Sequence, residues 1–304
     1  MRDRVHDLTR RVHDLPTLPA VYQQVEALTR DPSASSAQLA QLLSRDPVLT
    51  ARLLRVVNSA RYALTERVTT VSRAVSILGH HTVRDTVLVT AVLSLLPNEP
   101  RRRDLAESFW RHAIAVGSAA QILGAPLGGP AAEEFFTAGL LHDIGKLIWL
   151  RFFPDDLQAM HEAAAASDIT LIEAELAMSG TSHVRLGRML ARRWRLPELY
   201  QDVIGFHHEV GGGTGNAAVC YAVQAADLVA HALELGWPSP LRLPVVQPEA
   251  WASLRLDPEV LPDTLEAVQA EFQENLELFP LFTHDSAGAV TGGPEALPAP
   301  ALAG

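Results

Sequence analysis

The sequence predicts an all-α protein, because apolar residues recur with the period of a helix and the alternation typical of strands is nearly absent. Asp46 and Pro47 are typical of a helix N-cap and of a first helical residue. Leu49, Leu53 and Val56 then fall on one face, which predicts an amphipathic helix that buries this stripe against its neighbours.

Similar signals continue along the chain. The apolar stripe Val71–Leu78 predicts a second helix, and Gly79 predicts its end, because glycine readily adopts the left-handed conformation found at helix C-termini. Asp104 with Glu107 resembles a capping box, which would start a helix that runs to about Gly124. We expect further helices over residues 133–151, 169–178, 182–195, 197–208, 216–235 and 260–278.

Loops are expected where glycine and proline gather. Residues 126–130 and 211–215 are two such stretches, and prolines recur over residues 237–262. Residues 282–304 are rich in alanine, glycine and proline and show no periodic apolar pattern. We therefore expect a disordered tail at this end of the chain.

The composition is that of a globular protein, with 48% apolar and 20% charged residues among 304, and it excludes a fibrous or wholly disordered chain. The longest nearly apolar run, Thr86–Leu96, is much shorter than the about 20 residues that span a membrane, so we expect no membrane partner. The start of the chain shows no secretory core and Cys220 is the only cysteine, so we expect a cytoplasmic protein.

Charge is unevenly distributed along the chain. Residues 1–111 hold 16 arginines against 11 acidic residues, whereas residues 112–304 hold 9 basic and 24 acidic residues. The acidic part disfavours nonspecific binding to nucleic acid. The run Arg101–Arg103 in the basic part is more simply a solvated linker than a nucleic-acid site. We therefore do not expect nucleic acid as a partner.

Histidines and aspartates indicate a metal site. They fall in five places, each on a separate predicted helix: His112, the pair His142 and Asp143, His183, the pair His207 and His208, and Asp227. Imidazole nitrogens and carboxylate oxygens suit Fe, Mn, Zn or Ni, and a helical bundle can bring such side chains into one pocket. Together these residues predict a divalent metal centre of one or two ions, and the choice among the four metals stays open.

Two of these residues are expected to face the core. His112 shares a helical stripe with Phe109 and Val116, and the alternative to a ligand is a core histidine bonded to a backbone carbonyl. Asp227 follows Val223 on an apolar stripe, and a buried carboxylate requires a cation or several hydrogen-bond donors. The alternative for Asp227 is a structural ion pair with arginine or histidine.

His142 and Asp143 lie within an almost entirely apolar predicted helix, so this helix is expected at the centre of the bundle. Adjacent residues can bind one ion that lies over the ridge of a helix. Lys146 follows Asp143 by three residues, on the same face, where it could neutralise Asp143 or hold a phosphate oxygen. It is the only lysine beside 24 arginines, which favours a role that a compact charge fills better than a planar guanidinium.

The remaining histidines are predicted at helix ends. Ser182 is a plausible N-cap that places His183 in a first turn, and His207 and His208 end a helix before a glycine loop. The alternative for His183 is an exposed histidine in a first helical turn. The alternative for His207 and His208 is a favourable interaction with the helix dipole.

Short motifs stand in a characteristic order between about residues 15 and 235. They are Leu15–Pro19, Asp46–Leu54, Val57–Ala60, Ala74–Gly79, Phe109–His112, Gly139–Lys146, Ser182–His183, Leu196–Pro197, His207–His208 and Ala226–Asp227. In these motifs the chain resembles an HDOD domain, a divergent branch of the HD-domain phosphohydrolases. The resemblance implies an all-α fold of two lobes.

The resemblance also implies where the lobes lie. An N-terminal helical lobe would cover residues 1–103 and an HD-like helical lobe residues 104–235. We expect residues 236–281 to form a C-terminal extension with one helix, followed by the disordered tail at residues 282–304.

A ligand set follows from the same resemblance. The first ion would be bound by His112, His142, Asp143 and Asp227 and a second by His183, His207 and His208, with Asp143 and Lys146 as catalytic residues. The chain departs from the related HD-GYP branch directly after Lys146, where Leu147–Leu150 replace that branch's usual residues. This departure weighs against hydrolysis of cyclic di-GMP.

Two functions are expected. The first is a bacterial signal-transduction module that keeps an HD-type metal site and acts through protein partners, as the resemblance to HDOD domains implies. The alternative is a metal-dependent phosphohydrolase or phosphodiesterase that binds a nucleotide or a cyclic dinucleotide, as the ligand set implies. A regulator that binds nucleic acid through the basic N-terminal lobe is a weaker third idea.

Overall fold

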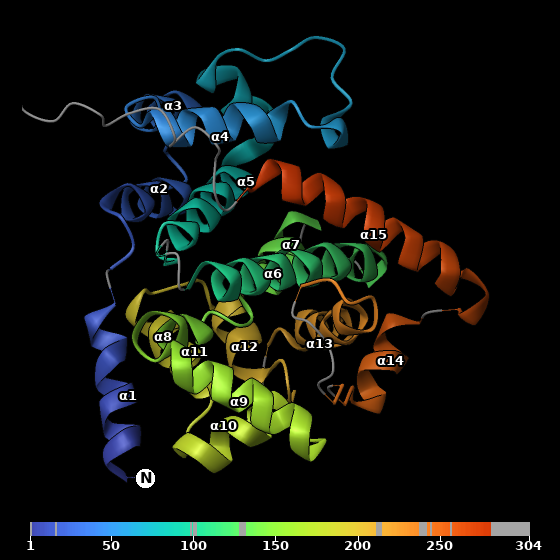
Figure 1. The fold of residues 1–304 in the computed structure, drawn as a ribbon. Helices are drawn as coiled ribbons and strands as arrows, with labels where there is room; N and C mark the ends of the chain where they lie inside the picture. The colour runs from blue at the N-terminus through green and yellow to red at the C-terminus, as the bar shows by residue number, and fades with distance from the viewer. Residues whose placement is uncertain are drawn as a thin grey trace, which may run out of the picture.

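The computed structural model describes residues 2–15, 17–97, 99, 102–127, 132–210, 215–236, 242–243, 245–255 and 257–280. These residues form α-helices and short 3-10 turns and no strand, so the predicted all-α class is confirmed (Figure 1). The helices are α1 (Arg2–Asp14), α2 (Ala20–Arg30), α3 (Ser36–Leu43), α4 (Pro47–Val57), α5 (Val71–Leu93), α6 (Arg103–Gly124), α7 (Ala132–Leu141), α8 (Lys146–Phe152), α9 (Pro154–Ser167), α10 (Leu171–Ser179), α11 (His183–Arg193), α12 (Glu198–Phe206), α13 (Ala217–Ala232), α14 (Pro248–Leu254) and α15 (Leu261–Leu278). The 3-10 turns are η1 (Ala60–Tyr62), η3 (Ala125–Leu127) and η4 (Pro258–Val260).

Helices α2 to α5 pack together at one end of the molecule (Figure 1). Two of them begin at strong N-caps. Ser35 and Gln38 form a capping box at the start of α3, in which each side chain accepts a hydrogen bond from the other residue's backbone N–H. The carboxylate of Asp46 accepts hydrogen bonds from the N–H groups of Val48 and Leu49 at the start of α4, as the sequence predicts.

Gly79 divides α5 into two helical segments and ends the first of them. Its φ of 76° and ψ of 165° interrupt the helix, but helical residues resume at once and continue to Leu93. The break at Gly79 agrees with the predicted stop. The residues that follow, among them Val83 and Val87, are fully buried and stabilise a second helical segment. The bent helix contacts α2, α3 and α4 as well as α7.

Helix α6 runs through the middle of the molecule and packs against α7, α13 and α15 (Figure 1). A glycine permits the close approach of α7, since a β-carbon on Gly139 would lie 2.7 Å from the carbonyl oxygen of Val116. The predicted capping box at Asp104 is wrong, because α6 begins at Arg103 without a side-chain cap. Asp104 lies instead in the first turn, where its charge interacts favourably with the helix dipole.

The helix predicted over residues 133–151 is interrupted. Helices α7 and α8 are separated by a turn that carries His142 and Asp143, so these residues do not lie on a helix ridge. The turn packs tightly against the start of α11, where a β-carbon on Gly145 would overlap the carbonyl oxygen of His183. This contact between distant segments explains a break that helical periodicity does not show.

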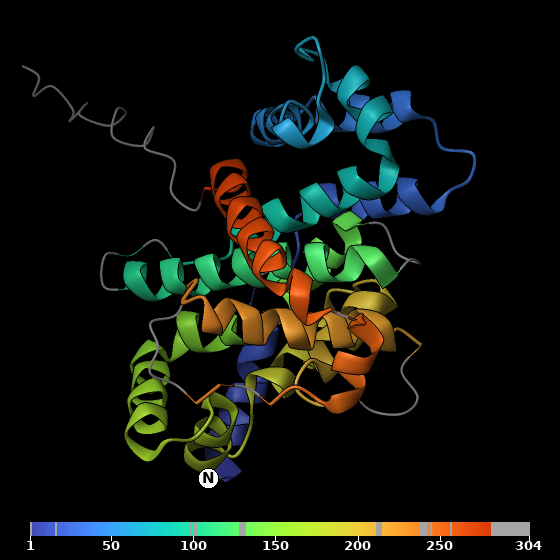
Figure 2. The same ribbon diagram turned by 90° about the vertical axis from the view of Figure 1, so that its right-hand side faces the viewer.

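The region after α13 contains two helices where the sequence predicts one, because the short helix α14 precedes α15. Helix α15 crosses α6 and reaches α4 (Figure 2). Trp110 Nε1 donates a hydrogen bond to the carbonyl oxygen of Phe279 at 2.8 Å, and Asn275 Nδ2 donates to Ser118 Oγ at 3.0 Å. Arg52 of α4 donates to the last carbonyl of α15 at 2.8 Å. Helix α15 therefore links the end formed by α2 to α5 with the central helix α6.

Helix α1 lies beside α8 and α11 and apart from α2 to α5 (Figure 1). The guanidinium of Arg193 on α11 donates hydrogen bonds to the carbonyl oxygens of Val12, at 2.6 Å, and Leu15, at 2.7 Å. The first helix thus packs on helices that the resemblance assigns to the HD-like lobe, although the expected N-terminal lobe, residues 1–103, includes this helix.

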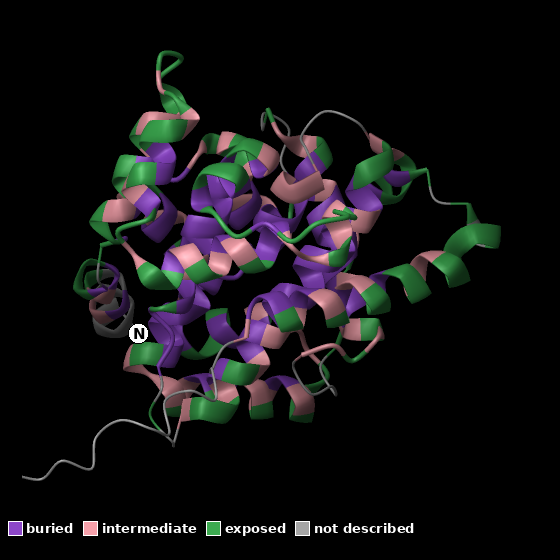
Figure 3. Cartoon of the chain, turned by 90° about the horizontal axis from the view of Figure 1, so that it is seen from above, coloured by how far each residue is buried: buried purple, intermediate pink, exposed green. Residues whose placement is uncertain are grey.

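Buried residues fill the centre of the molecule, and exposed residues lie on the outward turns of the surrounding helices (Figure 3). No helix within the described ranges combines the length and the apolar composition needed to cross a membrane. Residues 211–214 of the predicted glycine loop, Arg101 of the arginine run, and the predicted tail at 282–304 lie outside the described residues.

Candidate metal centre

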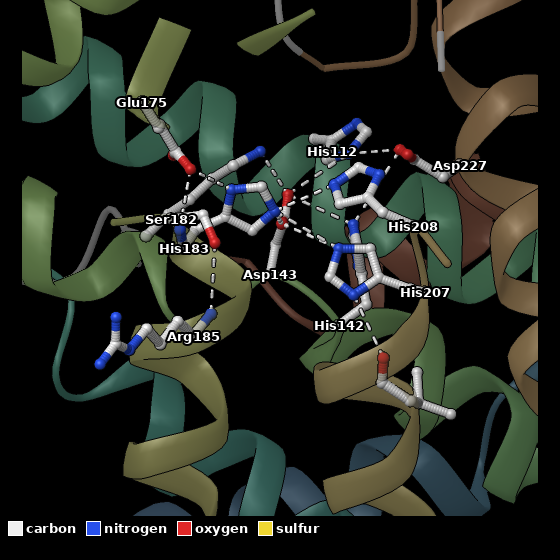
Figure 4. A network of polar contacts seen from close by, with 12 residues as sticks. His112, His142, Asp143, Glu175, Ser182, His183, Arg185, His207, His208 and Asp227 are labelled. Carbon is white, nitrogen blue, oxygen red and sulfur yellow. Dashed lines mark hydrogen bonds and ion pairs between the residues drawn. The ribbon is translucent and has the colours of Figure 1, made fainter. Parts of the chain in front are cut away.

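The structure brings all seven predicted ligands together around Asp143 (Figure 4). His112 projects from α6, His142 and Asp143 from the turn between α7 and α8, His183 from the first residue of α11, His207 and His208 from the end of α12, and Asp227 from α13. The residues are far apart in the chain, so the packing of the helices creates the site. Ser182 caps α11 as predicted, by accepting a hydrogen bond from Arg185 N.

One side of Asp143 faces two histidines and the second aspartate. The Nε2 atom of His142 lies 3.2 Å from Asp143 Oδ2 and 4.0 Å from Asp227 Oδ1. The Nε2 atom of His112 lies 3.8 Å from Asp143 Oδ2 and 3.1 Å from Asp227 Oδ1. Ligands that share one ion through bonds of about 2.0–2.2 Å lie at such separations. These four side chains are therefore spaced to bind a common cation.

The other side of Asp143 faces three histidines. The Nε2 atom of His183 lies 3.2 Å from Asp143 Oδ1, 3.4 Å from His207 Nε2 and 3.1 Å from His208 Nε2. The Nε2 atom of His207 lies 3.8 Å from Asp143 Oδ1. Asp143 thus offers one carboxylate oxygen to each group, and the two groups are arranged to hold two ions with Asp143 between them.

Buried polar atoms that make no hydrogen bond indicate that a cation fits here. The side chains of His112, Asp143 and Asp227 are 2%, 2% and 7% exposed. Within the described residues, His112 Nε2, Asp143 Oδ1 and Asp227 Oδ1 make no hydrogen bond. A buried polar atom without a partner destabilises a fold by about 1–3 kcal/mol. A bound cation removes this cost, and the nitrogen and oxygen donors suit a divalent transition metal.

Three of the histidines favour the form that binds metal. Burial lowers the pKa of His112 to about 4 and the pKa of His208 to about 3. Burial and the neighbouring His208 hold the pKa of His207 well below its usual range. These three rings are therefore neutral near pH 7 and keep a nitrogen lone pair for a cation.

The two aspartates are ionised despite their burial. Burial alone would raise the pKa of Asp143, but the neighbouring His142 and Lys146 outweigh it and hold that pKa well below its usual range. Burial of Asp227 is likewise outweighed, chiefly by His231, and its pKa is also held well below the usual range. Two ionised carboxylates at the centre of the bundle attract a cation.

Lys146 and a cavity lie directly beside the ligands. Lys146 is the first residue of α8, and its Nζ lies 2.5 Å from Asp143 Oδ2. Asp143, Lys146, His208 and Asp227 line a cavity of about 290 Å³. Sites for small molecules span about 300–1,000 Å³, so this cavity suits a small ligand next to the metal-binding groups.

Glu175 on α10 is a candidate that sequence reasoning missed. It is fully buried, and its Oε2 accepts a hydrogen bond from His183 N at 2.8 Å and lies 2.7 Å from His183 Nδ1. The contact turns His183 Nε2 toward Asp143, as carboxylates do for metal-bound histidines. Nothing in the sequence separates Glu175 from the exposed Glu173, so only the packing of α10 reveals its role.

Backbone carbonyls orient two further rings. The Nδ1 atom of His142 lies 2.6 Å from the carbonyl oxygen of Gly139, and that of His207 lies 3.1 Å from the carbonyl oxygen of Val203. In each ring an N–H at Nδ1 donates to the carbonyl, and Nε2 remains directed at the centre. The two histidines are thus held in the tautomer that a metal ligand needs.

His231 is the second residue that sequence reasoning missed. It follows Asp227 by one turn of α13, and its Nε2 lies 3.4 Å from Asp227 Oδ1. The spacing of four residues is the signal that could have identified it, because residues so spaced share a helix face.

Comparison with known protein families shows which family the chain belongs to. Residues 15–210, more than half of the sequence, match the HDOD domain family. The chain is a member of the HDOD domain family. The expected resemblance is therefore confirmed, and the matched part of this HDOD protein includes every predicted ligand except Asp227.

One relative of this HDOD protein is an uncharacterised protein of Treponema pallidum (strain Nichols). The two are 28% identical over 201 residues, which cover 66% of this chain and 39% of the relative. The chain thus spans about two fifths of the relative's length.

Solved structures share the fold of this HDOD protein. An HDOD domain protein of unknown function from Geobacter sulfurreducens has a TM-score of 0.73 at 24% identity, over 91% of this chain and 99% of that one. A protein from Shewanella amazonensis SB2B, whose description proposes a phosphohydrolase, has a TM-score of 0.67 at 25% identity, over 89% of this chain and 97% of that one. Both agree with the all-α architecture.

Proposed function

We propose that this HDOD protein binds two divalent metal ions and hydrolyses a phosphate ester in bacterial signal transduction. The observation that carries the proposal is the convergence of nitrogen and oxygen ligands on both sides of Asp143, directly beside a cavity. The likeness to the Shewanella amazonensis protein supports the same chemistry. Membership of the HDOD family supports the signalling role.

The residues of the chain suit this reaction in separate ways. Bound divalent ions would supply a water of lowered pKa and a Lewis acid for the phosphoryl oxygens. Lys146 lies at the wall of the cavity, where its ammonium can meet a phosphate oxygen and stabilise the charge that develops there. Leu171 and Ile172 line the same cavity and reduce the access of bulk water.

The cavity favours a small phosphate ester over a whole cyclic dinucleotide. Its volume of about 290 Å³ lies at the lower end of the range for small-molecule sites. Leu147, Ile148 and Trp149, at the position where the chain departs from the HD-GYP branch, are buried in the core and are not part of the cavity wall. A mononucleotide or an ester of similar size is therefore our preferred substrate class.

A regulatory module with a structural metal is the second candidate. Burial favours it, because the side chains of His142, His183 and His207 are 1%, 2% and 0% exposed, and closed sites are typical of structural metals. In that case the ions would stabilise the helices around the centre, and protein partners would receive the signal.

Metal content and hydrolysis, measured on the same preparations, separate the two candidates. The full chain is loaded with Mn²⁺ and assayed with p-nitrophenyl phosphate and bis-p-nitrophenyl phosphate. We expect metal-dependent hydrolysis of at least one ester. Asp143→Asn should lose both metal and hydrolysis, whereas Lys146→Gln should keep metal and lose hydrolysis. Asp155→Asn, in the exposed first turn of α9, is the matched control and should change neither.

The outcomes are distinct. Metal bound by the parent without hydrolysis of either ester would favour the regulatory module. A parent that binds no Mn²⁺ under any loading condition would contradict both candidates.

A further inference from the structure

His231 occupies a place at the centre that neither the predicted ligand set nor the family match includes. The match ends at residue 210, whereas His231 lies on α13, one turn after Asp227. The spacing of four residues puts both on one face of the helix. Their side chains meet, with His231 Nε2 3.4 Å from Asp227 Oδ1.

His231 has the geometry of a ligand. His112, Asp227 and His231 each offer an atom within 4.8 Å of the other two, which is the spacing that also relates the members of the two groups around Asp143. The rings of His112 and His231 lie 4.7 Å apart between centroids and are tilted by 42°. The side chain of His231 is 16% exposed against 2% for His112, so His231 stands at the edge of the centre.

Three imidazole nitrogens surround one carboxylate oxygen of Asp227. Asp227 Oδ1 makes no hydrogen bond within the described part of the chain. The Nε2 atoms of His112, His231 and His142 nevertheless lie 3.1, 3.4 and 4.0 Å from it. An ionised carboxylate oxygen has two lone pairs, so two N–H donors saturate it. The approach of three ring nitrogens is better explained by a cation that they share with Asp227.

We propose that His231 is a further ligand of the ion bound by His112, His142, Asp143 and Asp227. Both Asp227 and His231 line the cavity of about 290 Å³, so His231 would bind this ion from the side where a substrate lies. Three imidazoles and two carboxylates suit Fe, Mn or Zn. The inference rests on the proposed metal centre, and it adds a residue that determines the affinity for one ion and not for the other.

Metal titration tests this assignment. The whole chain of 304 residues, freed of metal, is titrated with Mn²⁺ as the parent, as His231→Gln and as His161→Gln, with free Mn²⁺ measured by EPR. His161 is the matched control because it lines the same cavity but belongs to none of the three ligand groups. We expect two ions in the parent and in the control. His231→Gln should weaken one ion at least about 10-fold and leave the other unchanged.

A crystal structure of the Zn²⁺-loaded parent distinguishes a ligand from a residue that only positions Asp227. We expect His231 Nε2 at about 2.0–2.2 Å from the ion. A distance above about 3 Å, beyond any bond to zinc, overturns the proposal even if His231→Gln weakens binding. His231→Glu, which restores a ligand of similar reach, should recover most of the lost affinity, and circular dichroism confirms that the variants fold.

Failure of this inference differs from failure of the proposed function. If Asp143→Asn loses metal while His231→Gln binds both ions as tightly as the parent, only the assignment of His231 is wrong. If the parent binds neither Mn²⁺ nor Zn²⁺, both the proposed metal centre and the assignment of His231 as a ligand are wrong.

Discussion

At the scale of single residues, the centre depends on carboxylates that hold other groups in place. Asp143 presents one oxygen to each group of histidines, and Glu175 contacts both the backbone and the ring of His183. A histidine without such a partner would rotate about its side-chain bonds, and ordering it on metal binding would cost entropy. The contact from Glu175 therefore contributes to affinity without touching the ion.

Glu175→Gln tests this orienting role. The amide is a weaker acceptor for the His183 N–H than the carboxylate, so we expect the ion on the His183 side of Asp143 to bind about 10–100-fold more weakly, with the other ion unaffected. Titration with Mn²⁺ measures both affinities. Glu173→Gln is the matched control, because Glu173 lies two residues away, is exposed, and caps α10 through a contact that glutamine can also make. Unchanged binding in Glu175→Gln would refute the role.

Gly145→Ala tests the close packing beneath the centre. The added β-carbon would overlap the carbonyl oxygen of His183, so either the turn or α11 must move. We expect a loss of about 1–3 kcal/mol in the free energy of unfolding, as for other overpacked sites, together with reduced metal content. Urea denaturation and elemental analysis measure the two effects.

Gly205→Ala provides the contrast for Gly145→Ala. Gly205 lies within α12, and its β-carbon would meet only the side chain of Arg188, at 3.2 Å, which can shift. Alanine also favours the helix by about 0.5–1 kcal/mol over glycine. Gly205→Ala should therefore be neutral or slightly stabilising. Equal destabilisation by the two changes would contradict the idea that close packing at Gly145 causes the loss of stability.

At the scale of elements, α15 links helices that are distant in the chain. Its contacts with Trp110 and Ser118 reach α6, and its contacts with Arg52 and Arg61 reach α4 and η1. Val268 and Phe272 on the same helix are fully buried. Loss of α15 would expose apolar side chains of α6 and leave several buried polar groups without partners.

Two truncations follow from this arrangement. Removal of residues 282–304, which the sequence predicts to be disordered, should shift the melting temperature by no more than about a degree or two. Removal of residues 261–304, which also removes α15, should lower it by at least about 10 degrees, because it uncovers the core around α6. Thermal denaturation followed by circular dichroism compares the two. A large drop from the shorter truncation would show that the tail binds the folded protein.

At the scale of the whole molecule, the centre joins helices that are far apart in the chain, from α6 to α13. The ligands come from α6, α11, α12 and α13 and from the turn before α8, so ions would bind the folded arrangement and not the unfolded chain. Ligands that bind only the folded state stabilise it by mass action. The protein with bound metal should therefore be more stable than the protein without it.

Chelation should lower the stability of the parent. At free metal about 100 times the dissociation constant, one ion adds about 2.7 kcal/mol, so we expect EDTA to lower the melting temperature of Mn²⁺-loaded protein by several degrees. Asp143→Asn is expected to bind little metal, so EDTA should hardly change its melting temperature. Differential scanning calorimetry with and without EDTA measures both. An equal response of parent and variant would place the stabilising ion elsewhere.

Local signals in the sequence predicted the elements that depend on local physics. Asp46 predicted the start of α4, because a cap and the N–H groups it satisfies lie within three residues. Gly79 predicted the break within α5. It did not predict that a second helical segment follows at once, because a residue's conformational preference does not show what the next segment packs against. The break after α7 was missed because it arises from contact with α11, about forty residues later.

The sequence by itself determined the all-α class, the predicted ligand residues and their resemblance to HDOD domains, because these rest on periodicity, residue chemistry and motif order. Only the tertiary structure decided that Asp143 faces two groups of histidines and that Glu175 and His231 join them. The physical reason is that a helix face is a local property, whereas the distance between two faces depends on how every intervening helix packs.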